Sequence, residues 1–350
     1  MILTDHPRTA AAVSDEVLAA RRLAAHCKAY MSAHTGRALL QLATTAIPFL
    51  AIAVLMVVLV EYSIWLTLAL AVLAAGFVVR LFIIQHDCGH GSFFHSRFAN
   101  TLTGRLISLV TFTPYAHWRR SHAQHHAGSG NLKRRGVGDI NTLTVREYLG
   151  LPAGKRLRYR LYRNPFVLFT LGMPIYFLVL QRFPFGAQLP LLETMSSIGP
   201  LNVALVAVYG SLMAAVGVKL LLLAYLPVML ISSWIAGWLF FVQHQFEDAY
   251  WEEHEEWNFH LAAVRGSSYY ALPKVLQWFT GNIGLHHIHH MCSRIPNYRL
   301  QKCMDDCEEL RHASPKLTLL ESFKCMRLSL WDEERRKLVG FGDLRKQKPA

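Results

Sequence analysis

The sequence predicts an all-α integral membrane protein with about four transmembrane helices, additional interfacial or re-entrant helices, and a cytoplasmic cap that carries a histidine-rich metal site. Hydrophobic residues make up 53% of the 350 residues and the mean hydropathy is +0.24, as in membrane proteins whose apolar residues are contiguous. Histidines recur in three clusters at helical spacing. The formal net charge of +13 is typical of a membrane protein with basic cytoplasmic loops.

Two apolar stretches near the N-terminus predict the first pair of spanning helices. Residues 39–60 are about as long as a helix that crosses the hydrocarbon core. Residues 61–63 are too short for a domain and predict a tight turn, after which residues 64–84 return. Arg80 lies inside this second stretch, where a charge is costly unless it contacts protein or reaches the headgroups. We expect Arg80 to snorkel to the headgroups.

The apolar segment 98–113 is short for a span and is interrupted by Asn100, Gly104 and Arg105. If it crossed the membrane, the histidine clusters before and after it would lie on opposite faces and could not share a metal site. We therefore interpret this segment as interfacial or re-entrant.

The second half of the chain contains three further apolar stretches. Residues 165–181 predict a third span, and residues 220–242 form the longest stretch and predict the fourth. If residues 201–217 also crossed fully, the last histidine cluster would lie on the wrong side of the membrane. We expect residues 201–217 to span only partly, or one of these segments to be re-entrant.

The polar segments indicate orientation and compartment. Residues 114–163 read as a hydrophilic loop with eleven Lys and Arg residues against only Asp139 and Glu147, which predicts a cytoplasmic, headgroup-binding segment and no nucleic-acid site. The six cysteines include no CxxC pair and suggest a reducing compartment, with Cys303 and Cys307 as ordinary helix residues. The predicted units are a cytoplasmic segment 1–38 with an amphipathic helix at the membrane surface, a membrane domain 39–300 and a cytoplasmic tail 301–350.

Three histidine clusters predict a metal site. On a helix, residues at i, i+3 and i+4 share one face, and this spacing or its i, i+4 part occurs at His86 and His90, at His122, His125 and His126, and at His286, His289 and His290. His287 is turned away from its neighbours by roughly 100°. The eight imidazoles exceed what one four-coordinate zinc ion uses, so two transition metals sharing a site is the simpler interpretation. The alternative is a set of solvated histidines at polar helix ends, which the recurrence of the pattern disfavours.

Carboxylates near the histidines are candidates to orient them, because ligating histidines usually donate their second ring nitrogen to a carboxylate or carbonyl. Asp87 follows His86 directly, and Glu247 and Asp248 follow His244 in an acidic segment. The sequence also disfavours other site classes: it contains no HExxH motif of a zinc protease and no cysteine spacing of an iron–sulfur domain. A metal transporter is disfavoured because the clusters lie at span ends and in loops.

The order of the clusters, HDCGH, then HAQHH, then HHIHH, resembles the membrane fatty acid desaturase superfamily with its HxxxH, HxxHH and HxxHH boxes. The stretches TPYAHWRRSHAQHHAGSGNL and VQHQFEDAYW look like the acyl-lipid branch that includes Δ12 (ω-6) desaturases. The resemblance covers residues 39–300. The boxes alone are shared with hydroxylases and ketolases of the same superfamily.

The resemblance implies an O₂-dependent di-iron enzyme that introduces a cis double bond, at Δ12 of a monounsaturated, lipid-linked acyl chain. Alternatives are a Δ9 or ω-3 desaturase, or a fatty-acid or carotenoid hydroxylase or ketolase. The resemblance also implies membrane lipid acyl chains as substrates, a separate electron donor such as ferredoxin, and histidine boxes on the cytoplasmic side. The implied ligands of two iron ions are His86, His90, His122, His125, His126, His244, His286, His289 and His290.

Overall fold

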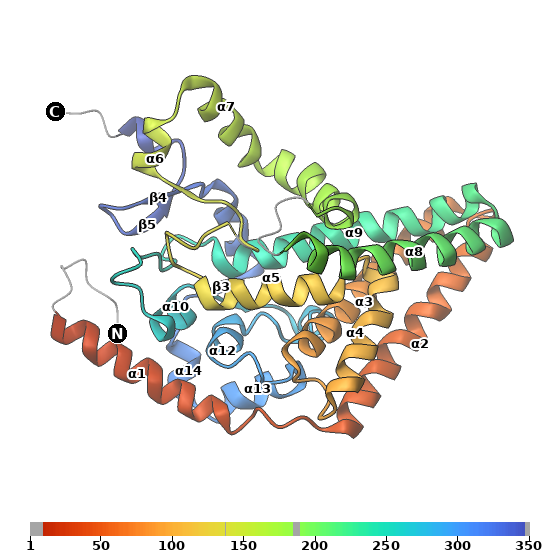
Figure 1. Cartoon of the computed structure of the whole chain (residues 1–350), viewed down its shortest axis with the longest axis horizontal. Helices are drawn as coiled ribbons and strands as arrows, with labels where there is room; N and C mark the ends of the chain where they lie inside the picture. Colours follow the sequence, from red (N-terminus) through yellow and green to blue (C-terminus); the bar gives the residue numbers. More distant parts are fainter. Residues whose placement is uncertain (1–9, 137, 185–189, 347–350) are drawn as a thin grey trace.

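The structure is a computed structural model that describes residues 10–136, 138–184 and 190–346. Long helices extend from one end of the molecule, and shorter helices with two small sheets form a cap at the other end (Figure 1). This arrangement confirms the predicted all-α membrane architecture.

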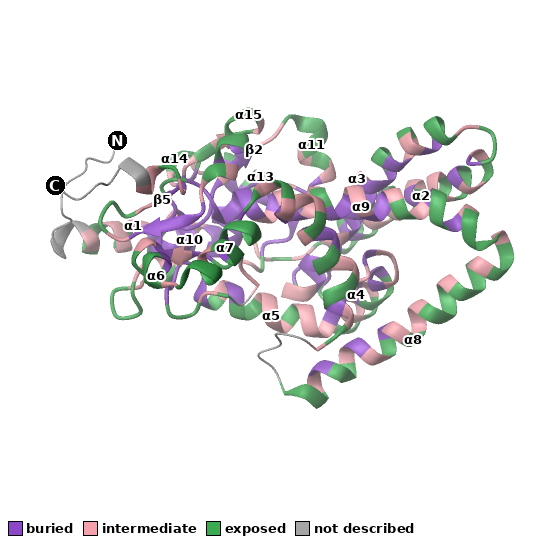
Figure 2. Ribbon diagram, turned by 90° about the horizontal axis from the view of Figure 1, so that it is seen from above, coloured by how far each residue is buried: buried purple, intermediate pink, exposed green. Residues whose placement is uncertain are grey.

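Four helices of the described chain are long and apolar enough to cross a membrane. They are α2 (Thr35–Leu59), α3 (Ile64–His90), α8 (Leu191–Val216) and α9 (Val218–His244). Helix α3 packs against both α2 and α9 and is the most buried of the four, whereas α8 has few buried residues and alternates between exposed and half-buried positions (Figure 2). An exposed apolar surface of this kind is what lipid would cover.

The predicted fourth span, residues 220–242, is confirmed as α9, whereas the two apolar segments before it differ in part from the prediction. Residues 201–217, expected to span only partly, belong to α8, which starts ten residues earlier because Pro200 and the polar residues before it are accommodated within the helix. Residues 165–181, expected as the third span, lie in a helical stretch made of η1 (Val167–Gly172), η2 (Ile175–Val179) and η3 (Leu180–Arg182) with short α-helical links. This stretch is bent by 69° from α7 (Ala153–Tyr162), and the bent pair is a broken span or a re-entrant loop, in line with the expectation that one of these segments is re-entrant. Crossing by α8 and α9 brings the end of α9 back to the side where α3 ends.

Helix α4 (Arg97–Thr111) is the segment that we interpreted as interfacial or re-entrant. It has 15 residues and is not among the four long helices. One of its faces packs along α3, and its other face exposes Phe98, Leu102 and Leu106. The i, i+4, i+8 spacing of these three residues gives an apolar stripe suited to the membrane interface.

Arg80 does not snorkel, contrary to our expectation. Its side chain is 7% exposed and its guanidinium carbon lies 3.9 Å from the centre of the Trp278 ring. Nε donates to Thr45 Oγ1 at 3.2 Å, and Nη1 donates to the carbonyl of Trp278. The charge is therefore stabilised by protein, through cation–π contact and hydrogen bonds.

The cap is built from short elements, and residues 114–163, predicted as a hydrophilic loop, contribute several of them. Those are α5 (Tyr115–Gly128), β1 (Leu143–Thr144), α6 (Val145–Gly150) and α7. The C-terminal half adds α10 (Phe259–Arg265), α11 (Lys274–Phe279), α12 (His286–Met291), α13 (Asn297–Asp305), α14 (Glu308–His312), α15 (Leu319–Ser322), η4 (Phe323–Arg327) and η5 (Asp343–Lys346). Strand β1 pairs in parallel with β4 (Leu330–Asp332), β4 pairs antiparallel with β5 (Lys337–Val339), and β2 (Tyr269–Ala271) pairs in parallel with β3 (Lys316–Thr318).

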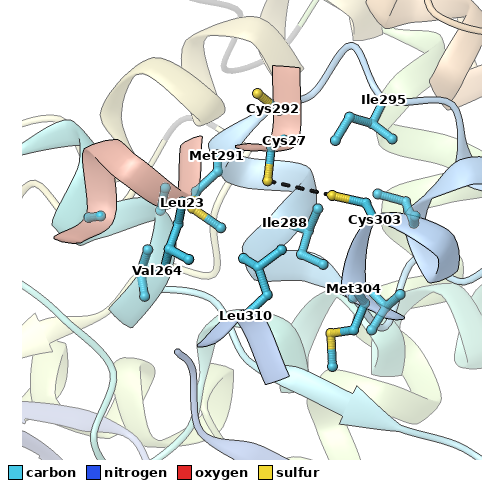
Figure 3. Close-up of a cluster of buried hydrophobic side chains, with 14 of the residues drawn as sticks. Leu23, Cys27, Val264, Ile288, Met291, Cys292, Ile295, Cys303, Met304 and Leu310 are labelled. Carbon is cyan, nitrogen blue, oxygen red and sulfur yellow. Dashed lines mark hydrogen bonds between the residues drawn. The ribbon is translucent and has the colours of Figure 1, made fainter. Parts of the chain in front are cut away.

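We expected the N-terminal helix to lie at the membrane surface. In the structure this helix, α1 (Ala10–Lys28), packs on the cap. Leu23 and Cys27 join an apolar cluster with Ile288 of α12 and Leu310 of α14 (Figure 3). Cys303 lies in α13, as predicted, and its sulfur is 3.7 Å from that of Cys27 in this core. Cys307, also expected in a helix, instead precedes α14 in an extended conformation. This cluster supports the back of the helix that carries the third histidine box.

Candidate metal centre

The first box lies on the last turn of α3. His86 and His90 are separated by one helical turn, and their ring centres are 4.7 Å apart. The helix ends at Gly91, whose φ of 67° is left-handed and whose N–H bonds to carbonyls of the last turn. A left-handed residue at this position favours glycine. Gly91, as the C-cap residue, therefore ends α3 directly after His90.

Asp87 joins the first box to the segment that follows the third. Its Oδ1 lies 3.1 Å from His86 Nδ1, which is the contact expected from the sequence. Its Oδ2 accepts hydrogen bonds from the backbone N–H of Asn297 at 2.6 Å and from the Asn297 side chain at 2.8 Å. A buried carboxylate with three such partners fixes the orientation of the His86 ring.

The second box lies on α5, which carries His122, His125 and His126. His125 Nδ1 lies 2.6 Å from Asp139 Oδ1, and both side chains are almost fully buried. The loop that carries Asp139 approaches α5 closely at Gly138, where an added Cβ would lie 3.3 Å from the Cβ of His125. Asp139 therefore holds His125 in place.

His244 ends α9, and its second ring nitrogen has a backbone partner. Nδ1 donates to the carbonyl of Gly266 at 2.9 Å. The expectation that Glu247 or Asp248 serves this purpose was wrong: Glu247 pairs with Lys337 at 2.8 Å on the surface. The carbonyl of Gly266 orients His244 instead.

The nine predicted histidines come together in two groups. Within each group the candidate ligand atoms lie within 4.8 Å of one another. The five-imidazole group consists of His86, His90, His122, His126 and His289, and the four-imidazole group consists of His125, His244, His286 and His290.

The donor set fits metal ions. Nδ1 of His244 donates to the carbonyl of Gly266 and Nδ1 of His125 faces Asp139, so in both rings Nε2 is the nitrogen directed at the other imidazoles and able to bind a metal ion. These two Nε2 atoms lie only 3.2 Å apart, and His244 Nε2 lies 3.0 Å from that of His286. Buried acceptors that face each other are unfavourable without a cation between them. Ligands of one metal, each about 2.1 Å from it and at right angles, would have this separation.

The protonation state also suits metal binding. Burial, assisted by repulsion among neighbouring imidazoles, holds the pKa of each of these side chains well below the usual 6.5: His122, His126, His286, His289 and His290. The rings are therefore neutral at physiological pH, and the neutral imidazole is the form that ligates metals.

His287 faces away from both groups, as the helical spacing predicts. It is completely buried, and its Nε2 donates to the carbonyl of Leu310 at 3.1 Å. Burial lowers the pKa of His287 to about 4. Its role is a contact between α12 and α14.

A cavity of about 390 Å³ opens beside the five-imidazole group. His90 and His122 line it, and the ring of Trp118 forms part of its wall while stacking on His122 at 4.6 Å and 16°. The other lining residues are Cys88, Gly89, Gly91, Arg97, Asn100, Thr101, Tyr115, Arg119, Arg120 and Ala123. The cavity therefore gives a ligand access to one side of the metal centre.

Comparison with known proteins identifies the family. The profile of the fatty acid desaturase family matches residues 63–319. The chain belongs to the fatty acid desaturase family. It is 44% identical to a fatty acid desaturase of Bacillus subtilis (strain 168) over 323 residues, which is 92% of this chain and 90% of that protein. As a member of this family it is an oxidoreductase, and its four apolar helices and histidine groups agree with a membrane-bound, metal-dependent desaturase.

Two cyanobacterial relatives are more distant. An sn-1 acyl-lipid omega-3 desaturase (ferredoxin) of Nostoc sp. (strain 36) is 27% identical over 64% of this chain and 62% of that protein. An sn-1 oleoyl-lipid 12-desaturase of Picosynechococcus sp. is 25% identical over 63% of each chain. The match to these acyl-lipid desaturases therefore spans less than two thirds of their length.

Three residues that the sequence did not single out complete the centre: Asp139, Gly266 and Asn297. Asp139 could have been found, because it is one of only two acidic residues in the basic stretch 114–163. The carbonyl of Gly266 carries no side-chain signal.

Proposed function

We propose that the nine histidines hold two iron ions and that the enzyme uses O₂ and electrons from a separate donor to introduce a cis double bond at Δ12 of a monounsaturated acyl chain on a membrane lipid. The observation that carries this proposal is the pair of adjacent imidazole groups with a cavity against one of them. Two irons with imidazole ligands would supply the oxidising power that breaks an unactivated C–H bond.

The chain's own residues have three tasks in this reaction. Asp87, Asp139 and the carbonyl of Gly266 fix the ring orientations. Burial of the four-imidazole group excludes water from the reaction site. The cavity wall positions the acyl chain, because selective oxidation needs two adjacent carbons to be held next to the metal centre.

The charge distribution supports the proposed electron donor and the proposed side of the membrane. The basic residues of 114–163 lie in the same cap as the histidines of α5, which supports boxes on the cytoplasmic side. A basic surface attracts a small acidic protein, so a ferredoxin is a suitable donor, and one relative is named for it. Cysteines introduced near Lys133 and Gln301 should be labelled from the cytoplasmic side; labelling from opposite sides would exclude the shared site.

The reaction is tested by expression in a host whose lipids contain only saturated and Δ9-monounsaturated chains, followed by gas chromatography with mass spectrometry. We expect 9,12-dienoic chains. New Δ9 monoenes or ω-3 products would reject the position but keep desaturation, and hydroxylated or oxo chains would reject desaturation. Metal analysis of the purified protein should find about two irons per chain; full activity with zinc alone would reject iron.

A further inference from the structure

The cavity lies where three segments meet: the end of α3, the start of α4 and the first half of α5. His90 and His122 form its inner side, toward the five-imidazole group. A ligand that fills this cavity therefore has one end close to the metal centre and the other at the surface of the cap.

Three arginines line the cavity, and none of the lining residues is acidic. Arg120 is neutralised, because its Nη1 lies 2.6 Å from Oε1 of Glu193. Arg97 and Arg119 are exposed, and within the described parts of the chain neither forms an ion pair. Arg119 also lies over the Tyr115 ring, with its guanidinium carbon 5.9 Å from the ring centre. Two uncompensated guanidinium groups thus border a cavity that has no negative charge of its own.

The part of the cavity wall that α4 supplies, Arg97, Asn100 and Thr101, adjoins the apolar stripe of that helix. Arg97 begins the helix, and Phe98, the first residue of the stripe, is 76% exposed. Leu102 and Leu106 continue the stripe at 46% and 57% exposure. An exposed apolar face with cationic residues at its edge is typical of a helix that lies at the boundary between headgroups and acyl chains. The two arginines are then placed at the level of lipid phosphates.

We propose that Arg97 and Arg119 bind the phosphate of the substrate phospholipid, so that an acyl chain of the same lipid extends past Trp118 toward the metal centre. This inference rests on the proposed function and adds the chemical class of the acyl carrier. Guanidinium groups bind phosphate through charge-assisted, frequently bidentate hydrogen bonds. Holding the phosphate fixes one end of the substrate and so sets how far along the chain the metal centre acts.

The same phosphate chemistry occurs in a soluble carrier that bears phosphopantetheine, such as acyl-CoA. The stripe of α4 favours the membrane source, because a lipid phosphate reaches the arginines without leaving the bilayer surface. The two sources are separated by supplying the same acyl chain on either carrier.

The first experiment measures kcat and KM for purified holoenzyme with one acyl chain presented on phosphatidylglycerol, on a phosphate-free glycolipid, or on CoA. For phosphatidylglycerol, the double variant Arg97→Gln/Arg119→Gln should raise KM about tenfold or more, because two charge-assisted contacts are lost, and should change kcat less. The glycolipid KM should stay the same. Arg119→Lys, which keeps the charge, should recover part of the loss. Arg105→Gln is the matched control, since Arg105 is exposed on α4, the helix of Arg97, but does not line the cavity.

The four possible outcomes of the first experiment lead to different conclusions. A KM effect confined to phosphatidylglycerol supports the proposal. Equal KM increases for phosphatidylglycerol and the glycolipid would show that the arginines do not bind phosphate. An effect seen only with acyl-CoA would assign the same chemistry to a soluble carrier and overturn the membrane source. Effects of Arg105→Gln as large as those of the double variant would reduce the result to general surface charge.

A second measurement does not depend on turnover. Phosphatidylglycerol with a photoreactive group on its headgroup is incorporated into nanodiscs with the wild-type enzyme, and the labelled peptides are mapped. We expect labelling within residues 97–101 and 115–123, with loss in the double variant. If labelling is found there but no lipid is desaturated, the proposed reaction fails while the phosphate site stands. If desaturation is found but labelling lies elsewhere, only the phosphate site is refuted.

Discussion

The two imidazole groups of the candidate metal centre consist of the same side chain but differ in how far a substrate can reach them. The five-imidazole group borders the cavity, and three of its members, His90, His122 and His126, are only half buried. The four-imidazole group is buried throughout, and His125 and His244 have fixed partners on their second nitrogen. One half of the centre is therefore open to a substrate, while the other half is sealed and rigidly held.

The division between the groups follows a rule within each box. Residues at i and i+4 enter the same group, as His122 and His126 do in α5, and the residue at i+3, His125, enters the other. In α12 the pattern is repeated with the groups exchanged: His286 and His290 join the four-imidazole group and His289 joins the five. Helices α5 and α12 thus each contribute to both groups and hold them next to each other.

The largest effect is expected when the four-imidazole group loses one of its histidines. His125→Ala leaves three imidazoles there and also leaves Asp139 as a buried charge without its partner. We expect turnover to fall below detection and metal content to fall by about half, because each group holds one ion in the function proposed above. His90→Ala leaves four imidazoles in the open group and should retain more metal. Mass spectrometry of bound metal checks both, and equal metal loss would remove the distinction between the groups.

Replacing the two orienting carboxylates should separate metal binding from folding. Asp139→Asn alters only the partner of His125, so metal affinity should fall about 10- to 100-fold with little change in unfolding temperature. Asp87→Asn also weakens the hydrogen bonds to Asn297, so it should additionally lower stability by about 1–3 kcal/mol.

Metal titration and thermal unfolding of the two variants supply the comparison. If Asp139→Asn unfolds as early as Asp87→Asn, the carboxylate of Asp139 has a structural role and does not mainly orient a ligand. If the Asp87→Asn variant is as stable as wild type, the hydrogen bonds between Asp87 and Asn297 do not stabilise the contact between the first and the third box.

The sequence predicted the nine histidines, because helical spacing and family motifs are local. It did not predict how they divide, since residues at i, i+3 and i+4 share a face and only the positions of the other helices decide which partner each one meets. The partner of His244 was missed for a related reason: Gly266 acts through its backbone carbonyl, from a distant segment. Arg80 was misread because Trp278, which stabilises it, is nearly two hundred residues away.

The same reasoning explains the errors in the membrane segments. Polar residues and Pro200 hid the first turns of α8, although a helix tolerates them when neighbouring groups satisfy its backbone. Residues 165–181 have the composition of a span, yet the helix that they form is bent by 69° from α7 at the break between Tyr162 and Val167. Composition reports apolar length, whereas continuity of the helix depends on a few residues.

The smallest effect is expected at His287, which lies between histidines of both groups on α12 but hydrogen-bonds to the carbonyl of Leu310. His287→Gln keeps a donor for the carbonyl of Leu310, so turnover per folded molecule and bound metal should stay within about twofold of wild type. His287→Leu removes the donor and leaves that carbonyl buried without it, so stability should fall by about 1–3 kcal/mol while bound metal per folded molecule is unchanged. Thermal unfolding and metal analysis of the two variants separate these effects. Loss of metal in folded His287→Gln would instead make His287 part of the centre and contradict the helical rule that sorts its neighbours.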